Sequence, residues 1–231
     1  MRLLPTAEST NAEAAADPQP DTIVVADHQT AGRGRLDRSW ETPAGSGLTF
    51  TAVVDPELAD HDWPLLPLAV AVAVADGVRT ATGLPVAVKW PNDLLVGEGK
   101  LAGILLERVA GADGRPLALI GIGINVALSA EELPVPTATS LAIAGSSVER
   151  TELFAAVVPA LATILDALRA EPAAVLERYR SECDTLGRQV TVHLPDGETF
   201  TGTAEALDRS GRLVVDGRAV GAGDVVHVRR S

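Results

Sequence analysis

The stretch Gln29-Thr30-Ala31-Gly32-Arg33-Gly34-Arg35-Leu36-Asp37-Arg38-Ser39-Trp40 is the most informative part of the chain. It combines glycines with three arginines and has little apolar content. Apolar runs flank it at residues 22–26 and 48–54. Such short runs, rich in β-branched residues, are typical of strands. The sequence therefore predicts two strands joined by a loop over residues 29–47, and a loop of that length is usually functional or disordered.

The glycines and arginines of this loop suit the binding of an anion. Glycine lets the backbone approach a ligand closely, and guanidinium groups make charge-assisted hydrogen bonds to carboxylates and phosphates. By itself, the same composition is equally typical of a solvated basic loop. Standard phosphate motifs are absent: no Gly-Lys-Ser/Thr triplet occurs, and Gly121-Ile122-Gly123 lacks the third glycine of the dinucleotide fingerprint. Any nucleotide must be held in another way.

Further apolar segments predict an α+β fold with a mixed sheet and packed helices. Leu and Ala recur at helical spacing before Gly83, where the pattern stops. Helices are predicted over residues 64–82, 151–169 and 173–185. Strands are predicted over residues 86–90, 100–109 and 117–126. Together these segments form a predicted first domain, residues 1–186.

The pattern changes after Gly187. Short alternating runs follow, and Asp196-Gly197 and Asp216-Gly217 separate some of them. Asp-Gly pairs between such runs favour tight hairpins. Residues 187–231 are therefore predicted to form a second, small all-β domain, a barrel of about four or five strands.

Composition limits the classes of function. The chain has 231 residues, of which 46% are hydrophobic, and 19 Lys and Arg against 31 Asp and Glu give a net charge of −12. This balance argues against general affinity for nucleic acids, which requires cations that displace counterions from phosphates. The four histidines have no metal-ligand spacing, and no metal ligands are assigned.

Several features predict a soluble, cytoplasmic protein. Cys183 is the only cysteine, so no intramolecular disulfide can form, and it is expected to be an inert buried thiol. The N-terminal residues have no apolar region of the signal-peptide type. The longest uncharged apolar runs are shorter than the ~18–20 residues that a membrane-spanning helix needs.

Three other short motifs carry chemical groups. They are Ser9-Thr10-Asn11, Lys89-Trp90-Pro91-Asn92-Asp93 and Lys100-Leu101-Ala102-Gly103-Ile104-Leu105. Taken singly, they would be a helix N-cap, a strand end with a turn, and a strand that begins with a surface lysine. None of them specifies a function alone.

Taken together and in order, these motifs closely resemble those of the biotin–protein ligase family. The signatures are Ser-Thr-Asn, Gln-x-x-Gly-Arg-Gly-Arg, Lys-Trp-Pro-Asn-Asp, Lys-Leu-Ala-Gly-Ile and Gly-x-Gly-x-Asn, the last at Gly121, Gly123 and Asn125. The resemblance is firm over residues 1–128 and continues through Ser140-Leu141, the later helices and the terminal barrel. It implies a biotinyl/lipoyl ligase catalytic domain, similar to class II synthetases, followed by an SH3-like barrel.

The resemblance also implies an activity. Such enzymes activate biotin with Mg²⁺ and ATP as biotinoyl-5′-AMP, then transfer it to a lysine of a biotin carboxyl carrier protein or domain of a biotin-dependent carboxylase. Some relatives carry an N-terminal DNA-binding domain, but here the first signature begins at Ser9. The expectation is therefore a ligase without repressor activity.

The resemblance assigns residues to the biotin site. Thr10, Asn11 and Gln29 would hydrogen-bond the ureido ring, with Ser9 beside them. Arg33, Gly34 and Arg35 would order over biotin and the adenylate, and Lys100, with Gly103 nearby, would contact the carboxylate and α-phosphate. Lys100 and Arg33 are the implied catalytic residues.

The same resemblance assigns residues to ATP and the adenylate. Trp40 would stack on adenine and Asn125 would bond its edge. Asp93 would contact the ribose or a magnesium ion carried by ATP. The other residues implied to bind the nucleotide are Arg35, Arg38, Lys89 and Asn92.

The implied reaction fits these residue types. A carboxylate and a triphosphate repel each other, so the site needs cations where charge develops. The product is a mixed anhydride that water destroys, and a loop that closes over it would exclude solvent.

Two other classes compete with this interpretation. A lipoate or octanoate ligase would share the fold, although its pattern lacks the Arg-Gly-Arg loop. A non-catalytic module that binds RNA or sequesters biotin is the second, and the net charge of −12 disfavours RNA. Lys100 and the arginine loop favour turnover over storage.

Overall fold

The computed structural model describes residues 1–35, 38–221 and 223–228. Within them, an eight-stranded mixed sheet forms the centre of the molecule, with seven strands in the order β1-β2-β4-β8-β7-β6-β5 and β3 paired with β2. β1 runs parallel to β2, and the other paired strands are antiparallel. Its strands are β1 (Arg2–Ala7), β2 (Thr22–Arg33), β3 (Ser39–Thr42), β4 (Gly47–Val54), β5 (Val86–Lys89), β6 (Asp93–Val96), β7 (Gly99–Ala110) and β8 (Pro116–Asn125).

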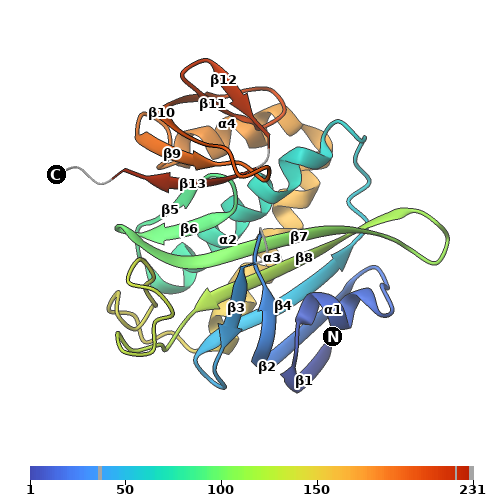
Figure 1. Ribbon diagram of the computed structural model, residues 1–231. Helices are drawn as coiled ribbons and strands as arrows, with labels where there is room; N and C mark the ends of the chain where they lie inside the picture. The colour runs from blue at the N-terminus through green and yellow to red at the C-terminus, as the bar shows by residue number, and fades with distance from the viewer. Residues whose placement is uncertain (36–37, 222, 229–231) are drawn as a thin grey trace.

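Helices cover both faces of this sheet (Figure 1). The long helices α2 (Leu66–Thr82) and α3 (Arg150–Ala170) pack on one face and against each other, while the short helix α1 (Thr10–Ala15) lies on the other. A 3-10 turn, η1 (Trp63–Leu65), leads into α2. Helix α2 ends at Gly83, whose φ of 70° is a conformation that glycine adopts without strain.

Alternation along β4 and β8 separates the core from the opposite face. Phe50 faces the helices and makes an edge-to-face contact with Phe154 of α3, with ring centroids 5.3 Å apart. Neighbouring Thr49 and Thr51 point to the α1 side, because successive side chains of a strand alternate. In β8, Gly121 and Gly123 face the same side as these threonines. The strands thus combine an apolar face with a polar, glycine-lined face.

Two helical segments, Trp63–Thr82 and Arg150–Ala170, are long and apolar enough to cross a membrane by length and composition alone. In the most apolar stretch of each segment, 67% of the first and 33% of the second is buried inside the protein. Since α2 is a core helix between the sheet and its neighbours, packing accounts for its apolar character.

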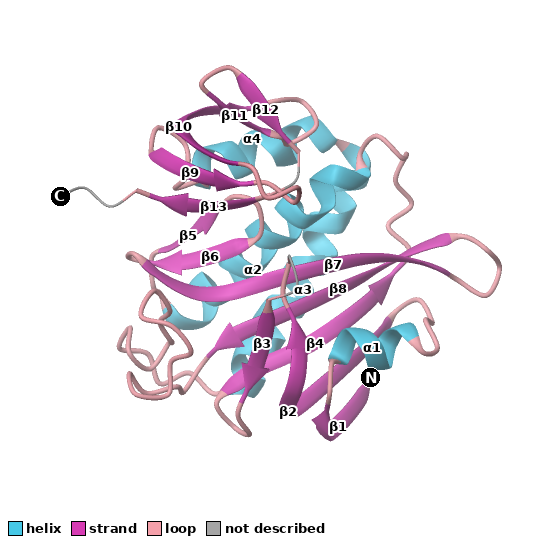
Figure 2. Ribbon diagram, in the orientation of Figure 1, coloured by secondary structure: helices cyan, strands magenta, loops and turns pink. Residues whose placement is uncertain are grey.

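A second, antiparallel sheet is built from the C-terminal part of the chain (Figure 2). It follows helix α4 (Pro172–Glu182), and its order is β12-β11-β10-β9-β13. In the described residues the end strands β12 and β13 are not paired with each other, so the expected barrel is not closed. The strands are β9 (Gln189–His193), β10 (Thr199–Leu207), β11 (Leu213–Val215), β12 (Arg218–Val220) and β13 (Asp224–His227).

The predicted hairpin at Asp216-Gly217 is confirmed. Val215 pairs with Arg218, which leaves a two-residue loop, and both loop residues have positive φ. Positive φ at both positions is what a type I′ turn requires. The predicted loop over residues 29–47 is too long, because β2 continues to Arg33 and pairs with β3. The short strand β6 was not predicted.

The two sheets share one apolar core. The indole Nε1 of Trp90 donates to the carbonyl of Gly211, 2.9 Å away, and the backbone N–H of Trp90 donates to Thr185 Oγ1 at 3.0 Å. Gly211 also lies so close to Leu68 of α2 that an added Cβ would stand 2.6 Å from that side chain. The C-terminal sheet is therefore packed directly on the rest of the molecule.

Candidate active site

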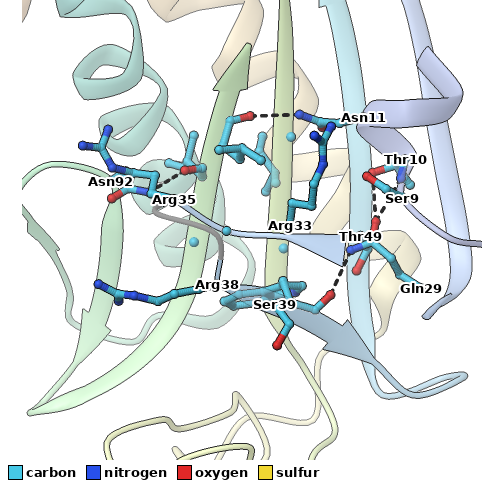
Figure 3. A pocket seen from close by; sticks show the side chains of 18 of the residues that line it. Ser9, Thr10, Asn11, Gln29, Arg33, Arg35, Arg38, Ser39, Thr49 and Asn92 are labelled. Carbon is cyan, nitrogen blue, oxygen red and sulfur yellow. Dashed lines mark hydrogen bonds between the residues drawn. The ribbon is translucent and has the colours of Figure 1, made fainter. Parts of the chain in front are cut away.

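A polar pocket lies on the α1 side of the central sheet, beneath the arginine segment, which we define as residues 33–38 (Figure 3). Leu36 and Asp37 of this segment lie outside the described residues. The pocket brings together residues of all five sequence signatures. Its lining contains Ser9, Thr10, Asn11, Gln29, Arg33, Gly34, Arg35, Arg38, Ser39, Trp40, Thr49, Asn92, Asp93, Lys100, Gly103, Ile104, Leu105, Gly121, Ile122, Gly123 and Asp224.

One end of the pocket is a buried network of neutral polar groups. Ser9 caps α1 by accepting from the N–H of Ala12, and this starts the helix so that Thr10 and Asn11 face the sheet. Gln29 Oε1 accepts from the Thr10 N–H at 3.0 Å and from its hydroxyl at 3.3 Å. Thr51 Oγ1 lies 2.8 Å from Thr10 Oγ1 and 2.6 Å from Asn11 Oδ1. Each of these side chains is held by at least one other.

The Thr51 hydroxyl cannot donate to both neighbours at once, because it has one proton. If it donates to Asn11, it accepts from Thr10, and Gln29 Oε1 then retains only the Thr10 N–H. If Thr10 donates to Gln29, Thr51 donates either to Asn11 Oδ1 or to Thr10 Oγ1, and the other of these two oxygens receives no proton from Thr51. In either arrangement one buried acceptor has spare capacity, and a ligand N–H would satisfy it.

Glycines form the floor of the pocket. A Cβ added at Gly121 would lie 2.2 Å from Asn11 Oδ1, and one at Gly123 would lie 2.4 Å from Trp40 Nε1. At Gly103 the nearest atom would be on the Trp40 ring, at 3.2 Å. The indole therefore lies directly on the backbone of β7 and β8, and side chains at these glycines would displace it. Trp40 Nε1 is buried and has no hydrogen-bond partner among the described residues.

Lysines and one carboxylate form the next part of the site. Asp93 is 6% exposed, and its Oδ1 lies 2.6 Å from Lys100 Nζ while its Oδ2 lies 3.6 Å from Lys89 Nζ. Lys100 Nζ is also 5.6 Å from the centre of the Trp40 ring. Asp93 thus fixes the Lys100 ammonium in the pocket.

The arginine segment is tied to two distant parts of the chain. Arg33 pairs with Glu107 of β7 at 3.1 Å. Arg35 Nη2 donates to the Gly223 carbonyl at 3.1 Å, and Arg38 pairs with Asp224 at the start of β13. Burial lowers the pKa of the Arg35 guanidinium, against the opposing effect of Asp224 and Asp93. Arg33, Arg35 and Arg38 are therefore each held by a contact with a distant part of the chain.

Most residues expected at the site line this one pocket, with two exceptions. The Asn125 amide is buried and donates to the Thr139 carbonyl at 2.9 Å, away from the lining. Lys89 reaches the site only through Asp93. The individual ligand contacts of all these residues stay predictions.

Sequence reasoning missed four residues at or beside the pocket. Thr49 and Thr51 alternate with apolar neighbours in β4, and that period of two was a usable signal for a polar face. Glu107 continues the Lys100 strand and carried no motif of its own. Asp224 comes from the second sheet, and nothing in the sequence indicates that it meets the arginine segment.

Comparison with known proteins agrees with this arrangement. Residues 4–126 match the Biotin/lipoate A/B protein ligase family, and residues 185–228 match the Biotin protein ligase C terminal domain. The sheet and its polar pocket thus belong to a ligase fold. The chain is a member of the Biotin/lipoate A/B protein ligase family, which confirms the expectation from its motifs.

Individual relatives extend over most of the chain. A Mycobacterium tuberculosis biotin–[acetyl-CoA-carboxylase] ligase is 40% identical, covering 90% of this chain and 79% of its own length. The Paracoccus denitrificans protein of the same name is 32% identical, with 94% of each chain covered. The structure of an Aquifex aeolicus biotin protein ligase in complex with biotin and ATP superposes with a TM-score of 0.83, at 27% identity, over 99% of this chain and 98% of that one.

Proposed function

We propose that this chain is a biotin–protein ligase that forms biotinoyl-5′-AMP from biotin and ATP. It then transfers biotin to a lysine of a biotin carboxyl carrier protein or domain. One observation carries the proposal: a single pocket has a neutral, hydrogen-bonding end and a side lined by lysine and arginine. The relatives named above support both the acid and the nucleotide.

The neutral end of the pocket favours biotin over lipoate. Biotin ends in a cyclic urea, which offers N–H donors and a carbonyl acceptor, whereas the dithiolane of lipoate offers neither. The buried groups of Thr10, Asn11 and Gln29 would be left unsatisfied by lipoate. A site built to hydrogen-bond its ligand discriminates strongly against an analogue that lacks those groups.

The cationic side suits the first chemical step. The biotin carboxylate attacks the α-phosphate of ATP and releases pyrophosphate. Lys100, with Arg35 and Arg38 near it, would stabilise the charge that develops on the phosphate oxygens. Because Asp93 holds Lys100 in place beforehand, little reorganisation is needed during the reaction.

The second step and its product need protection from water. The adenylate is a mixed anhydride, and we propose that the arginine segment covers it until a carrier lysine attacks its carbonyl carbon and displaces AMP. The anchors of this segment at Glu107, Gly223 and Asp224 support that role. Trp40 and Asn92 line the same cavity and are proposed to contact the nucleotide.

Magnesium is proposed to arrive with ATP and not on a resident protein site. Both oxygens of Asp93 face lysine ammonium groups, which makes this carboxylate a poor magnesium ligand. No group of three or more His, Cys, Asp or Glu side chains in the described residues could hold a metal ion. No step of the proposed mechanism uses a metal bound by the protein.

The wider setting is also proposed. We place a domain boundary at residues 186 and 187, which is supported by the C-terminal family match and by the start of β9. The names of the relatives support a carboxylase subunit as acceptor. We also propose a cytoplasmic location.

The decisive experiment mixes the purified protein with Mg·ATP and either biotin or lipoate, and measures pyrophosphate release. Biotin should drive release and lipoate should not. Mass spectrometry of a carboxyl-carrier domain should then show the addition of one biotin. Release driven equally by lipoate would refute the assignment of substrate, and release without carrier labelling would refute that of the acceptor.

A further inference from the structure

Glu107 connects the two halves of the pocket without belonging to any of its motifs. Its Oε2 accepts from Asn11 Nδ2 at 2.6 Å, and its Oε1 and Oε2 accept from Arg33 Nη2 at 3.1 and 3.3 Å. Asn11 belongs to the buried neutral end, whereas Arg33 begins the arginine segment. A single carboxylate therefore contacts both the neutral end of the pocket and the first arginine of the arginine segment.

A carboxylate in this position needs an explanation, because the proposed substrates are anions. Next to biotin's carboxylate and the phosphates of ATP, an unpaired Glu107 would raise the energy of every bound state. Its pairing with Arg33 offsets that charge. Moreover, in the described structure both bonds come from Nη2, so Nη1 and Nε of Arg33 can still donate to a ligand.

We propose that Glu107 is a positioning residue that couples the biotin end of the pocket to the arginine segment. It holds Arg33 over the site before ligand binds, and the same carboxylate fixes the amide of Asn11. A guanidinium that is already held in place loses less conformational freedom when a ligand engages it. This inference rests on the proposed function for the identity of the ligand, but the Arg33–Glu107 contact itself does not.

The contact can be tested by Glu107→Gln, which keeps an oxygen for Asn11 and removes the charge. Asp60→Asn is a matched control. Asp60 pairs at 2.8 Å with Arg108, which is the neighbour of Glu107 in β7, and Asp60 does not line the pocket. In the ligand-free protein, trypsin cleavage at Arg33, Arg35 and Arg38 should be about two- to fivefold faster in Glu107→Gln, as expected for loss of a partly exposed ion pair. Asp60→Asn should be cleaved as the unmodified chain is.

The functional arm is a double-mutant cycle with Arg33→Ala. Glu107→Gln alone should release adenylate about two- to fivefold faster. Arg33→Ala alone exposes the Glu107 charge to ATP and should raise KM for ATP. Adding Glu107→Gln to Arg33→Ala should then lower that KM by about three- to tenfold, and less so at high salt.

Two outcomes would overturn the inference. One is unchanged ligand-free cleavage in Glu107→Gln. The other is an equal fall in KM for ATP whether or not Arg33 is present, since Glu107 would then be a repelling charge and not an anchor. Failure of the unmodified chain to release pyrophosphate with biotin would instead refute the proposed function, and the ligand-free cleavage would still decide the role of Glu107.

Discussion

Asp93 shows how a single buried carboxylate can organise a cationic site. Its contact with ribose or magnesium stays a prediction, and in the structure it pairs with Lys100 at 2.6 Å and faces Lys89 at 3.6 Å. The sequence placed all three residues at the site, because they belong to strand ends that carry recognisable motifs. It could not indicate that they satisfy one another, since pairing depends on the register of β6 against β5 and β7.

Replacing Lys100 by alanine should damage adenylate formation far more than biotin binding. Losing a preorganised charge at a developing anion typically costs about 10²–10³ in rate. Pyrophosphate release and calorimetric biotin affinity would separate the two effects. Lys100→Ala also leaves Asp93 less well paired, so the double variant Asp93→Asn/Lys100→Ala serves as a control for folding. It should release pyrophosphate as slowly as Lys100→Ala does. Adenylation at the unmodified rate in either variant would remove Lys100 from catalysis.

The close contact between Gly123 and Trp40 leads to a second prediction. Gly123→Ala would place a Cβ 2.4 Å from Trp40 Nε1, so the indole must move off the sheet. We expect strongly weakened binding of biotin or ATP, with overpacking costing about 1–3 kcal/mol of stability. Equilibrium binding and thermal denaturation would measure these effects. Unchanged affinity for both ligands would mean that the position of Trp40 does not matter for the site.

The sequence predicts the orientation of the side chains in β4, but it does not predict the contacts that hold the arginine segment. The period of two in β4, with Phe50 toward the helices and Thr51 toward the pocket, follows from local patterning. The anchoring of the arginine segment does not. Arg35 and Gly223 are 188 residues apart, and only the packing of the second sheet on the first brings them together.

Loss of the Asp224 anchor should loosen the arginine segment. In Asp224→Asn the pair with Arg38 is weakened, so the segment should be cut faster by trypsin without ligand. Saturating biotin with Mg·ATP should restore part of the protection, because the ligand supplies new contacts. In the unmodified chain biotin alone should slow cleavage. Equal cleavage rates in both proteins, with and without ligands, would show that neither β13 nor ligand controls the segment.

Considered as a whole, the molecule is joined across its two sheets by a few buried polar contacts. Trp90 and Thr185 lie on the first side of this junction, and His227 of β13 reaches Thr185 Oγ1 at 3.1 Å from the second. The sequence predicted both units, because each has its own periodicity. It assigned no role to His227, since a lone histidine in a strand does not indicate what it packs against.

The environment of His227 makes the junction sensitive to acid. Burial, followed by the charges of Lys89 and Arg188, lowers the pKa of His227 to about 4. The unfolded chain binds this proton near pH 6.5 but the folded chain does not, so the free energy of unfolding should fall as pH is lowered from about 6.5 to about 4. Urea denaturation across this range should show a smaller loss in His227→Gln. Parallel pH profiles for the two proteins would contradict this effect.

The pairing of Lys89 and Lys100 with Asp93 has a consequence for self-modification. These are the only lysines in the sequence, and the other seventeen of the nineteen basic residues are arginines. An acyl adenylate acylates an amine through its nitrogen lone pair, whereas both lysine Nζ atoms face Asp93 and guanidinium groups remain protonated. Apart from its terminal amine, a ligase of this composition therefore has almost no group of its own that could react with the adenylate in place of the carrier lysine. After prolonged turnover without carrier, mass spectrometry should find both lysines unmodified, whereas a lysine introduced in the pocket lining by Ser39→Lys should become biotinylated.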